Sequence, residues 1–186
     1  MESFGKKLKD DSRIQQAKKL ILDAVKDAKK SITEVKPGDP SAKEFYSNLL
    51  EHAGELRGRA LFFPYIASGV GNGALVELAD GTVKYDFITG IGVHYLGHSH
   101  EKFIEAGINA AIEDTVMQGN LQLNSASVDL MQRLLNAATK NGSHLKHCFL
   151  TSSGAMANEN AFKIIFHNKQ PADRLLAFER CFSGRS

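Results

Sequence analysis

A strand–loop–helix–strand pattern between Lys146 and Glu179 constrains the fold of this chain most strongly. Residues 146–150 are a short apolar run, and residues 174–179 are a second one. Between them, residues 156–167 place alanine and isoleucine on one side at helical spacing. This order predicts a βαβ unit, in which the two strands are parallel and the crossover is right-handed. A parallel sheet needs further strands and covering helices, so we expect the front part of a larger α/β protein.

The residues before this pattern predict helices and one hairpin. Apolar spacing indicates helices over residues 12–34, from Pro40 to about residue 56 with Asp39 as the cap, from about residue 99 with Ser99 as the cap, and over 125–139. Residues 73–87 predict two short strands around the Asp80–Gly81 turn. The side chains expected to be buried are Ile14, Ala17, Ile21, Ala24, Ala28 and Ile32, then Phe45, Leu49 and Leu50, then Phe103, Ile104, Ile108, Ala111 and Ile112, and finally Leu130, Leu134, Leu135 and Ala138.

Composition narrows the class of protein. The 186 residues are 42% hydrophobic, and 23 basic residues face 21 acidic ones for a net charge of +2. Such a balance does not indicate a nucleic-acid partner. The first residues are polar and the chain has no long apolar run, so we expect neither a signal peptide nor a membrane partner. Cys148 and Cys181 lack CxxC spacing and are expected to be buried, reduced thiols in a cytoplasmic protein.

The segment TSSGA, residues 151–155, follows the first predicted strand and precedes the helix. Ligands of α/β proteins bind at this position, and the free N–H groups and dipole of a helix N-terminus favour a phosphate. A capped helix without a ligand is the alternative that these residues alone leave open. The chain has no GxxxxGK[ST] nucleotide loop, and the GxSxG pattern of a serine nucleophile is missing around Ser152 and Ser153.

Two other groups of residues resemble sites but favour structural roles. Gly69, Gly71 and Gly73 precede a hairpin rather than a helix, so they predict turn geometry instead of a dinucleotide loop. His94 and His98 lie in a loop, with His100 at a helix start, and no cysteine or acid completes a metal set. We expect turn and capping roles for these histidines and no metal.

Three segments together resemble the class III aminotransferases, pyridoxal-phosphate enzymes of fold type I that include the acetylornithine and ornithine aminotransferases. The segments are DFITGIGVHYLGHSHEKFIEA, LTSSGAMANENAFKI and FERCFSGRS, in the family's order, and the resemblance covers about residues 57–186. It implies an α/β fold with the start of a mostly parallel large domain, preceded by helices and a small hairpin element. The expected regions are 1–56 (helical), 57–98 (small β element and Gly-rich substrate segment) and 99–186 (first, incomplete part of the cofactor domain).

The resemblance implies roles for individual residues. Ser153, Gly154 and Ala155 would hold the phosphate of pyridoxal 5′-phosphate, and Phe182 followed by Ser183 would contact its ring. The remaining assignments are Gly90, Ile91 and Gly92 for the substrate pocket, and Asn158 and Glu159 as supporting residues. Three positions depart from the family pattern: Met156 replaces a Glu, Ser183 a His and Glu101 a Pro. Ile91, where ornithine-type enzymes carry a polar aromatic, favours another substrate.

The resemblance also indicates which catalytic residues of the family this sequence does not contain. The Schiff-base lysine and the acid that pairs with the pyridinium nitrogen would lie downstream of residue 186, and Lys163 is not expected to replace that lysine. The chain alone is therefore expected to be inactive. The parent protein would be a homodimer moving an amino group from an amino donor to a 2-oxo acid or aldehyde. Two alternatives stay open: a non-catalytic truncated chain that keeps a phosphate site, and a relative that catalyses isomerisation or decarboxylation.

Overall fold

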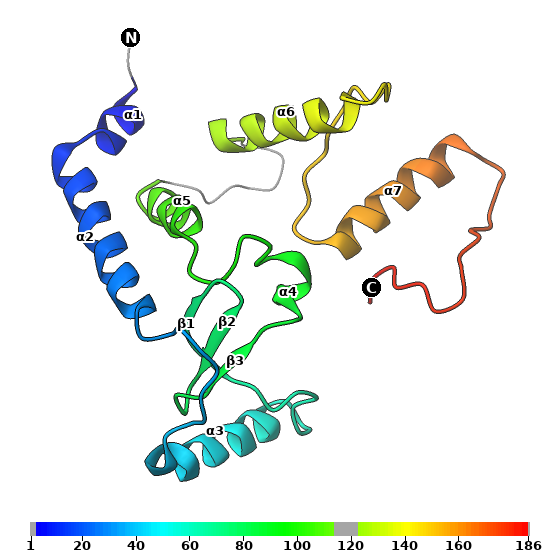
Figure 1. The fold of residues 1–186 in the computed structure, drawn as a ribbon. Coiled ribbons are helices and arrows are strands. Elements are labelled where there is room, and N and C mark those ends of the chain that lie inside the picture. The colour runs from blue at the N-terminus through cyan, green and yellow to red at the C-terminus, as the bar shows by residue number, and fades with distance from the viewer. Residues whose placement is uncertain (1–2, 114–122, 186) are drawn as a thin grey trace. The chain divides into compact units, whose positions relative to one another are not determined.

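The computed structural model describes residues 3–113 and 123–185, whose helices and strands are labelled in Figure 1. The chain divides into two compact units. The first unit comprises Met1–Asp114 and the second Thr115–Ser186. Mixed helix and strand content confirms the predicted α/β class. No helix in the described ranges is long and apolar enough to cross a membrane.

Two helices, α1 (Phe4–Lys9) and α2 (Ser12–Lys29), begin the first unit. The Asp11 carboxylate caps α2 by accepting from the Arg13 N–H at 2.8 Å. The predicted buried stripe is wrong over most of α2, because Ala17, Ile21, Ala24 and Ala28 are exposed. The face turned inward instead carries Ile14, Lys18, Leu22, Val25 and Lys29. Two lysines lie on it because polar atoms of the neighbouring helix and loop accept hydrogen bonds from them.

The break after α2 leads to the short helix η1 (Pro40–Ala42) and to α3 (Lys43–Leu56). The predicted Asp39 cap is confirmed, since its carboxylate accepts from the Ser41 N–H at 2.8 Å. The predicted burial of α3 is wrong for Phe45, which is 59% exposed, while Leu49 and Leu50 are half-buried.

A three-stranded antiparallel sheet in the order β1–β2–β3 forms the centre of the first unit. The strands are β1 (Ala67–Asn72), β2 (Leu75–Leu78) and β3 (Val83–Tyr85), and the register of the predicted hairpin pairs Val76 with Lys84. Its turn at Asp80–Gly81 confirms the hairpin prediction, with Gly81 at φ 80°. The buried core of the described residues is small: Ile32, Leu75 and Val83 form one cluster with Val70 packed against it, and Leu78 is also buried.

After the sheet, the chain forms the short turn α4 (Thr89–Gly92) and the helix α5 (Glu101–Ala111). The predicted Ser99 cap of α5 is wrong, because the His100 ring accepts from the Lys102 N–H at 3.3 Å. The Ser99 hydroxyl is instead the acceptor of the Gly71 N–H at 3.1 Å. The expected inward face of α5 is only half-buried at Ile104, Ile108 and Ile112, and it is exposed at Phe103 and Ala111.

The second unit contains the helices α6 (Ser125–Thr139) and α7 (Gly154–Asn168). The predicted strands 146–150 and 174–179 are wrong, because both segments are irregular in the structure. A strand requires a backbone partner, and within the described residues no backbone hydrogen bond joins these two segments. The predicted burial on α6 is also wrong: Leu130, Leu134 and Ala138 are exposed and Leu135 is half-buried.

The two cysteines are free in the structure. Cys148 is half-buried and Cys181 is exposed, so the prediction that both thiols are buried is wrong. Neither lies in a helix or strand that could cover it.

Candidate functional site

The N-terminus of α7 is built by Ser153. Its backbone is extended, with φ −161° and ψ 162°, and its hydroxyl accepts from the Met156 N–H at 3.2 Å. Its carbonyl accepts from the Ala157 N–H at 2.9 Å and from the Thr151 hydroxyl at 3.0 Å. Within the described residues, the N–H groups of Gly154 and Ala155 have no acceptor. Two backbone donors therefore remain at the positive end of the helix.

This helix start is open to a ligand. Ser152, Ser153 and Gly154 are exposed, and a Cβ added at Gly154 would meet no atom within 4 Å. The Ser152 hydroxyl lies two residues before the first free N–H. Hydroxyl groups and unpaired backbone N–H groups donate hydrogen bonds to phosphate in proteins, and the positive end of a helix dipole favours its negative charge. This segment has all three features, so it fits the phosphate of a cofactor.

A hydrogen bond joins α7 to the segment that contains Phe182. The side-chain amide of Asn158 donates to the backbone oxygen of Ser183 at 3.0 Å, although 25 residues separate them. The Phe182 ring is 75% exposed, and the Arg185 guanidinium lies 5.9 Å from its centroid. The structure thus brings Asn158, predicted as a supporting residue, to the backbone of Ser183, which was predicted to contact the cofactor and follows Phe182 in the chain.

Glu159 lies on another side of α7. It is half-buried and lines a pocket of about 750 Å³ with Phe162, Lys163 and the segment 170–173. None of the residues predicted to contact the cofactor lines this pocket. Glu159 thus lines a pocket together with the segment after α7, whereas Asn158 reaches the segment around Ser183.

The predicted substrate segment, in the first unit, has an unusual backbone. Thr89, Gly90, Ile91 and Gly92 all have positive φ, at 52°, 60°, 59° and 93°. A β-branched residue such as Ile91 adopts this region at a cost of about 1–2 kcal/mol. The Ile91 side chain is also 93% exposed, so packing does not compensate for the strain. Such strain concentrates at functional segments of proteins.

Asp86 holds this segment in place. Its carboxylate accepts from the Ile88 N–H at 2.8 Å and the Thr89 N–H at 2.9 Å, and it contacts His98 Nε2 at 2.7 Å. Burial opposes ionisation of the carboxyl, but the hydrogen bonds from Thr89, His98 and Ile88 outweigh it and lower the pKa of Asp86. Sequence reasoning missed this residue. An Asp whose carboxylate can accept from the backbone N–H groups two and three residues later is typical of an Asx turn, and this was the available signal.

The three histidines have structural roles in the structure. The His94 ring stacks on His98 with centroids 4.3 Å apart, and His100 caps α5. Among the described residues, no group of three or more His, Cys, Asp or Glu is arranged to hold a metal ion. The capping role predicted for His100 is confirmed.

Comparisons with known proteins agree with the motifs. The family model described as Aminotransferase class-III matches residues 61–186. The chain is 34% identical over 117 residues to the probable 4-aminobutyrate aminotransferase of Bacillus subtilis, covering 62% of this chain and 26% of that protein. It is 37% identical over 116 residues to the acetylornithine aminotransferase of Streptomyces coelicolor, covering 62% and 27%.

A third relative has a similar match. The acetylornithine aminotransferase of Mycobacterium tuberculosis (strain H37Rv) is 32% identical over 123 residues, covering 66% of this chain and 30% of that protein. The matched region therefore spans between a quarter and a third of the length of these relatives. No solved structure gives a significant match to this chain.

Proposed function

This chain belongs to the class III aminotransferases, and from that premise we propose that it is the cofactor-phosphate-binding part of a pyridoxal-phosphate-dependent aminotransferase. The parent protein would transfer an amino group from an amino donor to a 2-oxo acid or aldehyde. When bound, the cofactor would supply the electron sink for this transfer and carry the amino group between the two substrates.

We propose that the start of α7 binds the phosphate of this cofactor. The observation that supports this proposal is the pair of N–H groups at Gly154 and Ala155, which have no acceptor among the described residues and lie at the positive end of the helix beside the Ser153 cap. A dianion there gains charge-assisted hydrogen bonds and a favourable dipole interaction. The Gly154 backbone can approach the phosphate closely because no side chain covers it.

We propose that Phe182 and Ser183 contact the cofactor ring, with Asn158 as their positioning residue. The exposed Phe182 face offers a flat apolar surface on which an aromatic ring can stack. The hydrogen bond from Asn158 supports this, since it ties the neighbouring Ser183 backbone to the second turn of α7. Ser183 supplies a hydroxyl where the family carries a His, so it would contact the ring through a shorter side chain.

We also propose that Gly90, Ile91 and Gly92 contribute to the substrate pocket. The strained, exposed backbone of this segment supports the assignment, since strain is retained where a particular geometry is required. The homodimer, the cytoplasmic location and the regions 1–56, 57–98 and 99–186 are part of the same proposal. The homodimer and the regions rest on the family resemblance, and the cytoplasmic location rests on the two cysteines, which lack CxxC spacing and are free thiols.

The experiment that tests the phosphate site compares two ligands that differ only in that group. Pyridoxamine 5′-phosphate and pyridoxamine are titrated separately against the 186-residue chain by calorimetry. Neither has an aldehyde, so neither forms Schiff bases with surface lysines. Binding should be measurable with the phosphate and much weaker without it; equal affinity for the two compounds would overturn the proposal.

The proposed aminotransfer is tested by reading the coding frame after residue 186. A lysine in a strand-end loop downstream of a buried acid would supply the Schiff-base residue and the pyridinium partner that the reaction needs. A native chain that ends at residue 186 would overturn the proposed activity while leaving the phosphate site to stand on the titration.

A further inference from the structure

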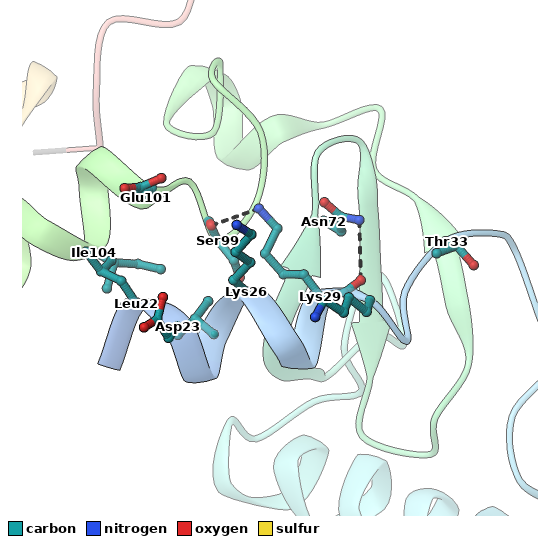
Figure 2. Close-up of a pocket in the computed structure, with 11 residues that line it drawn as sticks. Leu22, Asp23, Lys26, Lys29, Thr33, Asn72, Ser99, Glu101 and Ile104 are labelled. Carbon is teal, nitrogen blue, oxygen red and sulfur yellow. Dashed lines mark hydrogen bonds between the residues drawn. The ribbon is translucent and has the colours of Figure 1, made fainter. Parts of the chain in front are cut away.

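A second pocket lies in the first unit, far along the sequence from the start of α7. It has a volume of about 450 Å³ and is formed by the last turns of α2, by Asn72 at the end of β1 and by the start of α5 (Figure 2). Its side chains are Leu22, Asp23, Val25, Lys26, Lys29, Lys30, Thr33, Asn72, Ser99, Glu101 and Ile104. The α2 residues precede residue 61, where the family match begins, so the pocket is not explained by the segments shared with the family.

Two lysine ammonium groups in this pocket keep donors for a ligand. The Lys30 ammonium forms a salt bridge with the Asp27 carboxylate, at 2.6 Å. Lys29 donates to the Ser99 carbonyl at 3.2 Å, which occupies one of its three protons. Within the described part of the chain, Lys26 has no hydrogen-bond or salt-bridge partner. Figure 2 shows the Lys26 and Lys29 side chains next to one another in the middle of the pocket.

One carboxylate in the pocket is also available. Asp23 is paired with Lys19 at 3.3 Å. Glu101, in the first turn of α5, has no hydrogen-bond or salt-bridge partner among the residues that the structure describes. Figure 2 shows Glu101 on one side of the two lysines, and Asn72 and Thr33 on the other. The pocket thus offers two cations and one anion that lack full partners.

The neutral polar side chains of the pocket either are engaged already or can donate a further hydrogen bond to a ligand. The Asn72 amide is already engaged, since it donates to the Ile32 carbonyl at 3.0 Å. The Thr33 and Ser99 hydroxyls can each donate a further hydrogen bond. Leu22, Val25 and Ile104 supply apolar surface against which a short methylene chain can pack.

We propose that this pocket binds a small α-amino dicarboxylate, an amino acid of the glutamate class. Its two carboxylates would accept from Lys26 and Lys29, and its ammonium group would donate to Glu101. The chemistry follows from the charges that remain available, since such a ligand carries two negative groups and one positive group on a short apolar chain. The residues of this binding site belong to the first unit, and those of the proposed phosphate site belong to the second.

The test titrates L-glutamate into the full 186-residue chain without cofactor and measures affinity by calorimetry. We expect Lys26→Gln to weaken binding about tenfold, since it removes a charge-assisted hydrogen bond. Glu101→Gln should weaken it similarly. Lys43→Gln changes an exposed lysine outside the pocket and should leave the affinity unchanged. Among the described residues Lys26 has no hydrogen-bond or salt-bridge partner, and its charge acts on Asp27 only without a direct contact, so its variant should stay close to the wild-type melting temperature.

Two further titrations distinguish this pocket from other binding sites on the chain. Glutarate has both carboxylates but no ammonium group, so it should bind more weakly than glutamate and be insensitive to Glu101→Gln. Gly154→Asp should leave glutamate binding intact. Binding that is lost in Gly154→Asp and retained in Lys26→Gln would place the ligand in the second unit and overturn this proposal without affecting the proposed cofactor site. Absence of any glutamate binding would also overturn it.

Discussion

The Asn158 amide lies 3.0 Å from the backbone oxygen of Ser183 and donates to it. One hydrogen bond therefore links the helix whose start would hold a phosphate to the segment whose Phe182 would face the cofactor ring. Few other contacts order residues 179–185, which are largely exposed. The geometry of the proposed site depends on this link, and several expected outcomes follow from it and from the strained segment of the first unit.

Replacing Asn158 by Ala should weaken pyridoxamine 5′-phosphate binding. The loss of one net hydrogen bond corresponds to about 1 kcal/mol, or roughly fivefold in affinity. Asn160→Ala is the matched control, since Asn160 donates only to the Met156 carbonyl within α7, at 2.8 Å. Calorimetry on both variants measures the effect. An equal loss in the two variants would show that helix stability, rather than the position of Ser183, sets the affinity.

Replacing Phe182 by Ala should weaken the same ligand through lost ring stacking. Aromatic pairs contribute about 0.5–1.5 kcal/mol beyond area burial, so we expect a loss of roughly threefold or more. Phe178→Ala removes a similarly exposed ring four residues earlier and should have little effect. Pyridoxamine fluorescence, which a stacked ring perturbs, provides a second measurement. An unperturbed wild-type signal would rule out the stacking contact.

Replacing Ile91 by Gly should stabilise the first unit. Gly adopts positive φ without steric cost, and the exposed Ile91 side chain contributes little packing, so we expect a gain of about 1 kcal/mol. Ile88→Gly is the control, since Ile88 has φ −96° and the substitution there should destabilise instead. Denaturant unfolding of both variants gives the two free energies. A destabilising Ile91→Gly would mean that its side chain makes a contact that outweighs the strain.

The Asp86 carboxylate predicts a loss of stability in acid. Because the folded-state pKa of Asp86 is lowered, its stabilising effect is fully present above the unfolded value of about 3.9 and is lost as the pH falls through the folded value. The melting temperature of the wild type should therefore approach that of Asp86→Asn below about pH 4. A difference between the two proteins that stays constant from pH 7 to pH 3 would contradict this role.

Local signals in the sequence predicted much of the fold. The Asp80–Gly81 turn fixed the hairpin, Asp39 capped its helix, and α6 occupies the predicted residues. Each of these features depends on residues close together in the chain, where backbone preference and capping dominate. The start of α7 was also expected from TSSGA, although the structure begins the helix two residues earlier, at Gly154.

Features that depend on distant partners were predicted less well. The inward face of α2 includes Lys18, only 8% exposed, because Asn109 and Glu105 of α5 accept hydrogen bonds from its ammonium group. A buried helix face predicted only from the spacing of apolar residues does not include such a lysine. The expected strands at 146–150 and 174–179 likewise require a partner strand, and among the described residues the one backbone hydrogen bond of either segment is the turn from the Cys181 N–H to the Phe178 carbonyl.

The measurement that tests the central claim most directly is the affinity of pyridoxamine 5′-phosphate for the wild type and for Gly154→Asp. The Cβ of the new side chain would meet no atom within 4 Å, and its carboxylate would lie near the N–H groups of Gly154 and Ala155 and repel the phosphate. We predict a loss of at least tenfold in affinity, with pyridoxamine binding unchanged. Equal affinity of the two proteins for the phosphorylated compound would contradict the assignment of the α7 N-terminus as the phosphate site.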